Sequence, residues 1–64
     1  MTNILEDLRK EKGLRRDVVA KDLGITLSYY GMLETSTRKP SLPIAIKIAK
    51  YYGKPVEQIF CCNN

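Results

Sequence analysis

Adjacent basic side chains recur in this sequence, and two of the pairs, Arg15-Arg16 and Arg38-Lys39, are the first candidates for chemistry. Guanidinium and ammonium groups neutralise phosphate whatever the phosphate is attached to, so the chemistry open to these pairs is anion binding. The first pair falls at the expected start of a helix, where positive charge opposes the helix dipole. A partner outside the fold would explain cations at that place, and phosphate is the candidate. A solvated pair of arginines is the alternative.

The other polar residues show no arrangement suited to catalysis. The sequence has no histidine, no cluster with metal-ligand spacing and no glycine-rich phosphate loop. Asp17, Asp22 and Glu34 are not placed as paired carboxylates for acid–base chemistry. For the adjacent Cys61 and Cys62 we expect reduced thiols, with an intermolecular disulfide as the alternative. The chain is therefore not expected to be an enzyme or to hold a metal or another cofactor.

Length and composition indicate one small domain. The 64 residues, of which 44% are apolar, can bury one small core, and we place the domain at residues 1–60 and a tail at 61–64. Eleven Lys and Arg against seven Asp and Glu leave a net charge of +4, compatible with nucleic-acid binding or with solubility alone. No window approaches the ~18 apolar residues of a membrane span, and no signal peptide is visible. The expected location is the cytoplasm.

Residues 13–34 contain two short amphipathic segments on either side of a Leu23-Gly24-Ile25 corner. Apolar residues share one helical face on each side of it, namely Val19, Ala20 and Leu23 before and Tyr30 and Leu33 after. Two helices joined by so short a glycine-containing turn form a helix-turn-helix. The second helix of that motif can enter the major groove of DNA.

The sequence predicts five helical segments and no strand, which is typical of a compact all-α bundle. Capping residues, glycines and prolines mark the expected ends. The first segment runs from an Asn3 cap, with Glu6 completing a capping box, to Gly13, and the second runs from Arg15 or Arg16 to Leu23. The third runs from a Thr26 cap to Glu34 or Thr35. The fourth runs from a Ser41 cap to Gly53, and the fifth from Pro55 to Phe60. Outside the corner, the expected core residues are Ile4, Leu5, Leu8, Leu42, Ala45, Ile48, Ala49, Tyr52, Val56, Ile59 and Phe60.

A set of short motifs runs through nearly the whole chain. It comprises Leu8-Arg9-Lys10-Glu11-Lys12-Gly13-Leu14, Ala20, Leu23-Gly24-Ile25, Leu33-Glu34, Pro40-Ser41-Leu42, Ile48-Ala49 and Ile59-Phe60. In this register the chain resembles the Cro/C1-type (XRE) family of helix-turn-helix domains. The resemblance implies a lambda-repressor-like fold of five helices and a repressor-like transcriptional regulator. Its partner would be double-stranded DNA, with a recognition helix over about 27–35 in the major groove.

The resemblance also implies an ion pair between Arg9 and Glu34, which occupy the family's usual positions for a pair that ties the first helix to the recognition helix. Glu34 is the only charged residue between Asp22 and Arg38, which favours this pairing over two solvated side chains. A buried pair costs more to break than it contributes, because the remaining charge would be left unsolvated.

The positions at which the family usually reads bases hold Leu27, Ser28 and Met32, with Tyr29 beside them. None of these side chains can make the bidentate contacts to guanine or adenine that are worth ~1–3 kcal/mol each. An AT-rich site read through thymine methyl groups and DNA shape would fit this surface, and so would a protein partner. Gly31 costs ~1 kcal/mol relative to Ala inside a helix, so we expect something bulky, DNA backbone or partner, to approach there.

Both basic pairs fall where the family contacts the phosphate backbone. The residues expected to contact DNA are therefore Arg15, Arg16, Thr26, Leu27, Ser28, Tyr29, Met32, Arg38 and Lys39. One such module has a small footprint, so we expect a homodimer on a palindromic site. The family's usual pairing region implies an interface at Tyr51, Tyr52, Lys54 and Pro55.

The alternative function is a protein-interaction module on the same fold, such as an antirepressor or a subunit that binds another regulator. Three apolar residues at normally polar or groove-facing positions favour it, namely Val18, Leu27 and Met32. A salt-dependent interaction with random duplex DNA would favour the first function, and its absence would favour the second.

Overall fold

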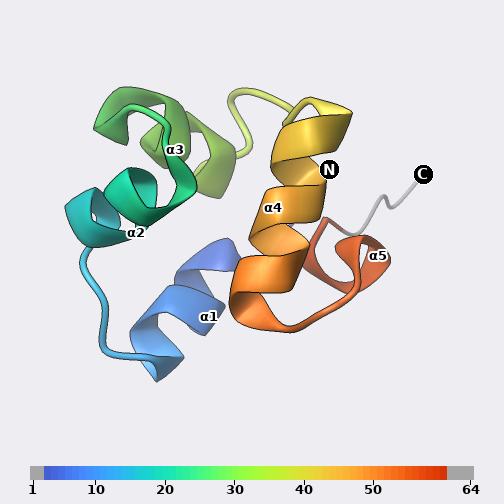
Figure 1. The fold of residues 1–64 in the computed structure, drawn as a ribbon, viewed down its shortest axis with the longest axis horizontal. Coiled ribbons are helices and arrows are strands. Elements are labelled where there is room, and N and C mark those ends of the chain that lie inside the picture. The colour runs from blue at the N-terminus through green and yellow to red at the C-terminus, as the bar shows by residue number, and fades with distance from the viewer. Residues whose placement is uncertain (1–2, 61–64) are drawn as a thin grey trace.

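The computed structural model of this chain describes residues 3–60, so the predicted tail with Cys61 and Cys62 lies outside the described residues. The described part has five helices and no strand: α1 (Leu5–Glu11), α2 (Arg16–Leu23), α3 (Leu27–Glu34), α4 (Leu42–Tyr52) and α5 (Val56–Ile59). Figure 1 shows α2 and α3 together at one end, α4 beside α5 at the other, and α1 below. The predicted all-α bundle of five helices is confirmed.

The core lies where the five helices meet, and both apolar faces flanking the predicted corner are in it. The buried apolar residues are Leu5, Leu8, Val19, Ala20, Leu23, Tyr30, Leu33, Ala45, Ile48, Tyr52, Ile59 and Phe60. Ile4, Ala49 and Val56 are half-buried and pack against this core. Leu42 was wrongly predicted to line it, since its side chain is 70% exposed. It stands on the first turn of α4, at the edge of the apolar stripe, where the successive 100° steps of a helix turn it towards solvent.

The start of α1 differs from the prediction. The helix begins at Leu5, with Ile4 rather than Asn3 at the N-cap position. The amide of Ile4 donates instead to the carbonyl of Ile59 at 3.1 Å, which ties the start of α1 to α5. Glu6 pairs with Lys10 at 3.2 Å, and the expected capping box is not formed.

Asn3 still serves the start of α1, from one position further out. Its Oδ1 accepts a hydrogen bond from the amide of Leu5 at 3.1 Å. Its Nδ2 donates to the carbonyl of Leu33 at 2.8 Å and to Oγ of Ser36 at 2.9 Å. One amide side chain thus joins the start of α1 to the end of α3.

The remaining helix ends agree with the prediction to within one or two residues. Ser41 occupies the N-cap of α4, although its side chain makes no capping hydrogen bond, and a proline lies in the first turn. Pro55 precedes α5 as predicted. The connection from α3 to α4 over residues 35–41 is the longest in the described chain.

Candidate nucleic-acid interface

The turn between α2 and α3 sets the direction in which α3 leaves the core. Gly24 closes α2 with φ of 73°, in the left-handed region that favours glycine. The amide of Ile25 donates to the carbonyl of Ala20 at 3.0 Å and satisfies the end of α2. Thr26 then caps α3, because its Oγ1 accepts from the amide of Tyr29 at 3.0 Å. The predicted cap at Thr26 is confirmed.

One side of α3 is anchored in the core and the other reaches the surface. Tyr30 and Leu33 are fully buried. The exposed side carries every residue of this helix that was expected to read bases: Leu27, Ser28, Tyr29 and Met32, of which Tyr29 and Met32 are half-buried. At 51% exposure, Leu27 offers solvent an apolar surface close to the start of the helix.

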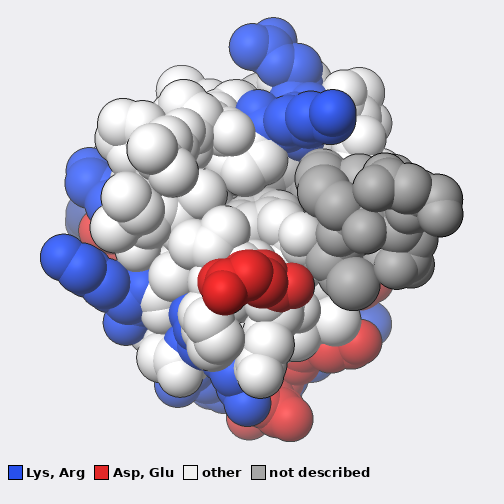
Figure 2. Space-filling model, turned by 90° about the vertical axis from the view of Figure 1, so that its right-hand side faces the viewer, with Lys and Arg blue, Asp and Glu red and all other residues white. Residues whose placement is uncertain are grey.

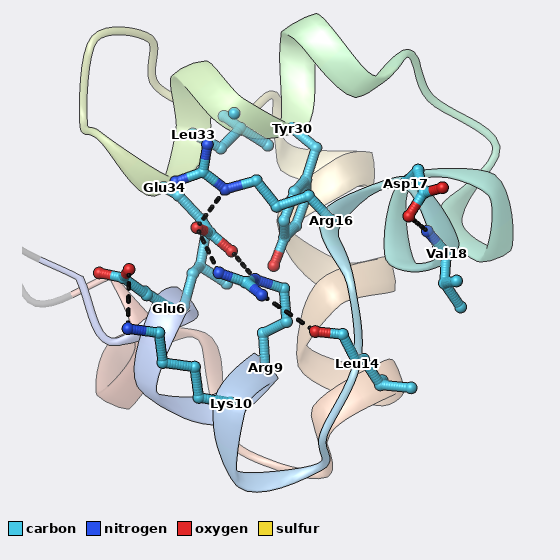
Figure 3. Close-up of polar contacts among 12 residues, drawn as sticks. Glu6, Arg9, Lys10, Leu14, Arg16, Asp17, Val18, Tyr30, Leu33 and Glu34 are labelled. Atoms are coloured by element: carbon cyan, nitrogen blue, oxygen red, sulfur yellow. Dashed lines mark hydrogen bonds and ion pairs between the residues drawn. The ribbon is translucent and has the colours of Figure 1, made fainter.

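Glu34, the last residue of α3, binds two arginines (Figure 3). Nε of Arg9 donates to Oε2 of Glu34 at 2.7 Å, and Nε of Arg16 donates to Oε1 at 3.0 Å. Nη1 of Arg9 also donates to the carbonyl of Leu14 at 2.9 Å, so Arg9 holds the loop after α1 as well. The ion pair between Arg9 and Glu34 is thus present, and Arg16 is a second partner that the sequence did not indicate.

The Glu34 side chain is 1% exposed, which makes its charge dependent on these partners. Burial by itself would raise the pKa of Glu34, but the hydrogen bond from Arg9 and the charges of Arg9 and Arg16 outweigh it and lower the pKa below its usual value. The same hydrogen bond raises the pKa of Arg9. The Glu34 carboxylate and the Arg9 guanidinium are therefore both charged at neutral pH.

Arg15 has a different environment from its neighbour Arg16. Its guanidinium pairs with the carboxylate of Asp17, with Nη2 to Oδ2 at 2.8 Å and Nε to Oδ1 at 3.1 Å. The two side chains are 78% and 51% exposed. An exposed pair of this kind contributes little to stability and is screened by salt, so a phosphate can replace Asp17 at little cost.

The second basic pair lies in the loop that follows α3. The amides of Thr37 and Arg38 both donate to the carbonyl of Met32, at 2.9 and 3.3 Å, so the loop folds back on the helix end. The guanidinium carbon of Arg38 lies 5.9 Å from the ring centroid of Tyr29, within cation–π distance. Lys39 is exposed beside it in sequence. The fold thus places Arg38, predicted to bind phosphate, against Tyr29, predicted to contact bases.

The sequence matches the model of the helix-turn-helix family over residues 5–59. The chain belongs to this family. It is of the Cro/C1 (XRE) type, so the resemblance inferred from its motifs is confirmed.

Three relatives illustrate the similarity of this helix-turn-helix domain to named proteins. It is 34% identical over 55 residues to the cryptic phage CTXphi transcriptional repressor RstR of Vibrio cholerae, covering 86% of this chain and 50% of that protein. It is 42% identical over 53 residues to the HTH-type transcriptional regulator YqaF of Bacillus subtilis, covering 83% and 70%. It is 37% identical over 60 residues to the HTH-type transcriptional regulator MJ0272 of Methanocaldococcus jannaschii, covering 94% and 91%. The chain thus spans about half the length of the phage repressor.

Of the four residues expected at the dimer interface, Tyr52 lies in the core of this helix-turn-helix domain. Tyr52 is 5% exposed, and its hydroxyl group lies 2.8 Å from that of Tyr30 in the core. Its side chain has almost no surface left to offer a partner, and the pairing of two copies through this region stays a prediction. Tyr51 is half-buried, and its hydroxyl donates to Oδ2 of Asp22 at 2.7 Å. The exposed residues of the predicted interface are Lys54 and Pro55.

In residues 3–60 there is no group of three or more His, Cys, Asp or Glu side chains that could hold a metal ion. No helix among the same residues is long and apolar enough to cross a membrane. We define the basic interface of the domain as the exposed side of α3 together with Arg15, Arg16, Arg38 and Lys39.

Proposed function

We propose that this helix-turn-helix domain binds double-stranded DNA with α3 in the major groove and regulates transcription, as a repressor does. The observation that carries the proposal is the basic interface, in which a helix anchored by Tyr30 and Leu33 shows its other side to solvent, with Arg16 beside Gly31 and Arg38 beside Tyr29. A major groove ~12 Å wide admits a helix of this size. The relatives support regulation, since one is named a transcriptional repressor and two are named transcriptional regulators.

The cations and the α3 side chains of the basic interface have different roles in DNA binding. The four cations hold phosphate, which positions the protein on any sequence. Ser28, Tyr29, Leu27 and Met32 offer only hydroxyl and apolar contacts, and so tune the preference for thymine methyl groups and groove shape. The Thr26 oxygen accepts the capping bond, and its hydroxyl proton remains for donation to a phosphate.

We further propose that two copies of the domain pair through the turn between α4 and α5, with Tyr51, Lys54 and Pro55 at the interface. Figure 2 shows uncharged surface, interrupted by acidic and basic side chains, on the side of the molecule that carries these helices. Ile46 of α4 is 42% exposed and offers further apolar surface on this helix. Sedimentation equilibrium over a wide concentration range, with and without duplex, tests the pairing. A strict monomer that binds DNA as a single copy rules it out.

A second candidate function is the protein-interaction module. Leu27 at 51% exposure and Val18 at 37% favour it, because they present large apolar side chains beside the basic pairs. A protein partner would cover both side chains, whereas DNA would cover Leu27 together with the cations.

Binding of a random-sequence duplex as a function of salt decides between the two functions. Four neutralised phosphates imply a slope of about −3.6 in log K against log salt for each protomer. Arg38→Ala should weaken binding to all sequences alike and reduce that slope by about one unit. Failure to bind any duplex at low salt would favour the protein partner. Tight binding that ignores all four cations would contradict the proposed basic interface.

A further inference from the structure

We propose that Glu34 is a positioning residue for DNA binding, because it holds Arg16 by Nε and leaves the two Nη groups as a preformed fork for one backbone phosphate beside Gly31. The inference rests on the proposed function, since it names the groups that receive a DNA phosphate. It assigns to Glu34 a role beyond its ion pair with Arg9, and it gives Gly31 a chemical reason to be glycine.

The fork follows from which nitrogen of Arg16 is engaged. Nε donates to Oε1 of Glu34 at 3.0 Å, and among the described residues Nη1 and Nη2 make no hydrogen bond. A guanidinium carries five N–H donors in one plane, of which four belong to the Nη groups. That outer edge matches two phosphate oxygens at once. Arg16 can therefore bind a phosphate without releasing Glu34.

The anchor of this fork is itself fixed. The Glu34 side chain is 1% exposed and is held from its other side by Arg9 at 2.7 Å. In Figure 3 the Arg16 side chain runs from the start of α2 across to the end of α3, where it meets Glu34. Among residues 3–60, Arg15 has only the exposed carboxylate of Asp17 as partner. The conformational entropy of a side chain that is already ordered in the free protein is not lost again on binding. Arg16 is therefore better preorganised for a phosphate than Arg15.

Gly31 lies next to the Nη edge. A Cβ built at this position would come 3.9 Å from Nη1 of Arg16, an ordinary contact distance. Gly31 has no positive φ, so its backbone does not require glycine, and glycine is unfavourable inside a helix. Any longer side chain there would lie against the Nη edge. Glycine leaves that edge open on the side of α3 that faces the groove.

A charge-preserving substitution at Arg16 distinguishes the contribution of the guanidinium geometry from that of its positive charge. Arg16→Lys keeps the cation but cannot bond Glu34 and a phosphate through one rigid plane. We expect affinity for a random-sequence duplex at low salt to fall about tenfold with an unchanged salt slope. Arg15→Lys is the matched comparison, and its loss should be at least about fivefold smaller. Equal losses at the two positions would overturn the inference.

A double-mutant cycle tests Gly31. Gly31→Gln should weaken duplex binding severalfold in the natural sequence and have little effect in an Arg16→Ala background, because the edge it covers is then absent. An equal loss in both backgrounds would mean that the glutamine meets DNA directly, and would refute the assignment of Gly31. Circular dichroism establishes that each variant is folded.

Inorganic phosphate distinguishes this inference from the proposed function. In ¹⁵N spectra of the full chain, the Nε resonance of Arg16 should shift saturably with phosphate, and Gly31→Gln should suppress the shift. If the domain binds duplex DNA but Arg16→Lys costs no more affinity than Arg15→Lys, the inference is overturned and the proposed function stands. A phosphate shift at Arg16 without duplex binding overturns the proposed function and leaves the fork. The absence of both overturns both.

Discussion

The hydroxyl groups of Tyr30 and Tyr52 lie 2.8 Å apart in the core and join α3 to α4. Tyr30 is fully buried, and Tyr52 is 5% exposed. Burial raises the pKa of both phenols, so both stay protonated over the physiological range, as a hydrogen bond between two hydroxyl groups requires. The recognition helix is thus held by a polar contact as well as by apolar packing.

Removing one hydroxyl of this pair should destabilise the fold. Tyr52→Phe leaves the Tyr30 hydroxyl buried without that partner, and we expect a loss of ~1–3 kcal/mol in the free energy of unfolding. Adding Tyr30→Phe removes the orphaned group, so the double variant should lose less than the sum of the single losses. Urea denaturation of the four proteins measures this coupling. Additive losses would mean that the hydroxyl groups act independently.

The buried ion pair should be among the most sensitive sites of the fold. Glu34→Ala leaves Arg9 without a carboxylate partner, and Arg9→Ala leaves the buried Glu34 carboxylate with Arg16 alone and the Leu14 carbonyl without its donor. We expect losses of ~3–5 kcal/mol. A chain of this length has a total stability of roughly 3–10 kcal/mol, so both variants should be close to unfolding. Lys10→Ala, which breaks only the exposed pair with Glu6, should cost less than ~0.5 kcal/mol. Losses below ~1 kcal/mol at Arg9 and Glu34 would contradict a buried pair.

The same pair predicts a dependence of stability on acid. The pKa of Glu34 is lower in the folded chain than the ordinary value of 4.5, so the folded state favours its carboxylate. The stabilisation is fully present above the unfolded pKa and is lost as the pH falls from about 4.5 through the folded pKa. Thermal unfolding followed by circular dichroism between neutral and acid pH checks this. Glu34→Gln should show a flatter profile; an identical profile would exclude Glu34 as the group responsible.

Asn3 should contribute more than its place near the start of the chain suggests. Asn3→Ala removes the hydrogen bonds to the Leu5 amide, the Leu33 carbonyl and Ser36, with an expected cost of ~1–2 kcal/mol. Asn3→Asp keeps an acceptor for Leu5 but cannot donate to Leu33. If the contact with α3 matters, Asp should be destabilising in urea titrations. An Asp variant as stable as the natural protein would leave only the capping role.

Tyr29 should influence DNA binding through Arg38. The ring lies 5.9 Å from the guanidinium, so it limits where Arg38 can reach. Tyr29→Phe retains the ring and should keep both affinity and salt slope, whereas Tyr29→Ala should weaken binding to all duplexes as well as change the preferred sequence. Fluorescence anisotropy with random and selected duplexes measures both effects. A change of preference alone would show that Tyr29 acts on bases independently of Arg38.

The helix ends could be predicted from the sequence because their signals are local. Gly24 supplies a positive φ and Thr26 supplies a capping oxygen within the span of one turn, and the apolar spacing around them predicts which faces are buried. The family follows from the same motifs in register. The local signal at the start of α1 failed because a distant group competed there: the amide of Ile4 bonds the carbonyl of Ile59.

Apart from the Arg9–Glu34 pair and the Thr26 cap, which were expected, only the tertiary structure decided how the polar residues are partnered. The sequence places Arg15 and Arg16 side by side, yet one pairs with an exposed neighbour and the other reaches Glu34, 18 residues away. Tyr52 was expected in the core, but the partner of its hydroxyl, that of Tyr30 22 residues away, follows only from the fold. Helical periodicity predicts which face a residue occupies, but not which side chain stands opposite. That depends on how the helices pack, and the strength of an ionic or hydrogen bond depends on the resulting distance and burial.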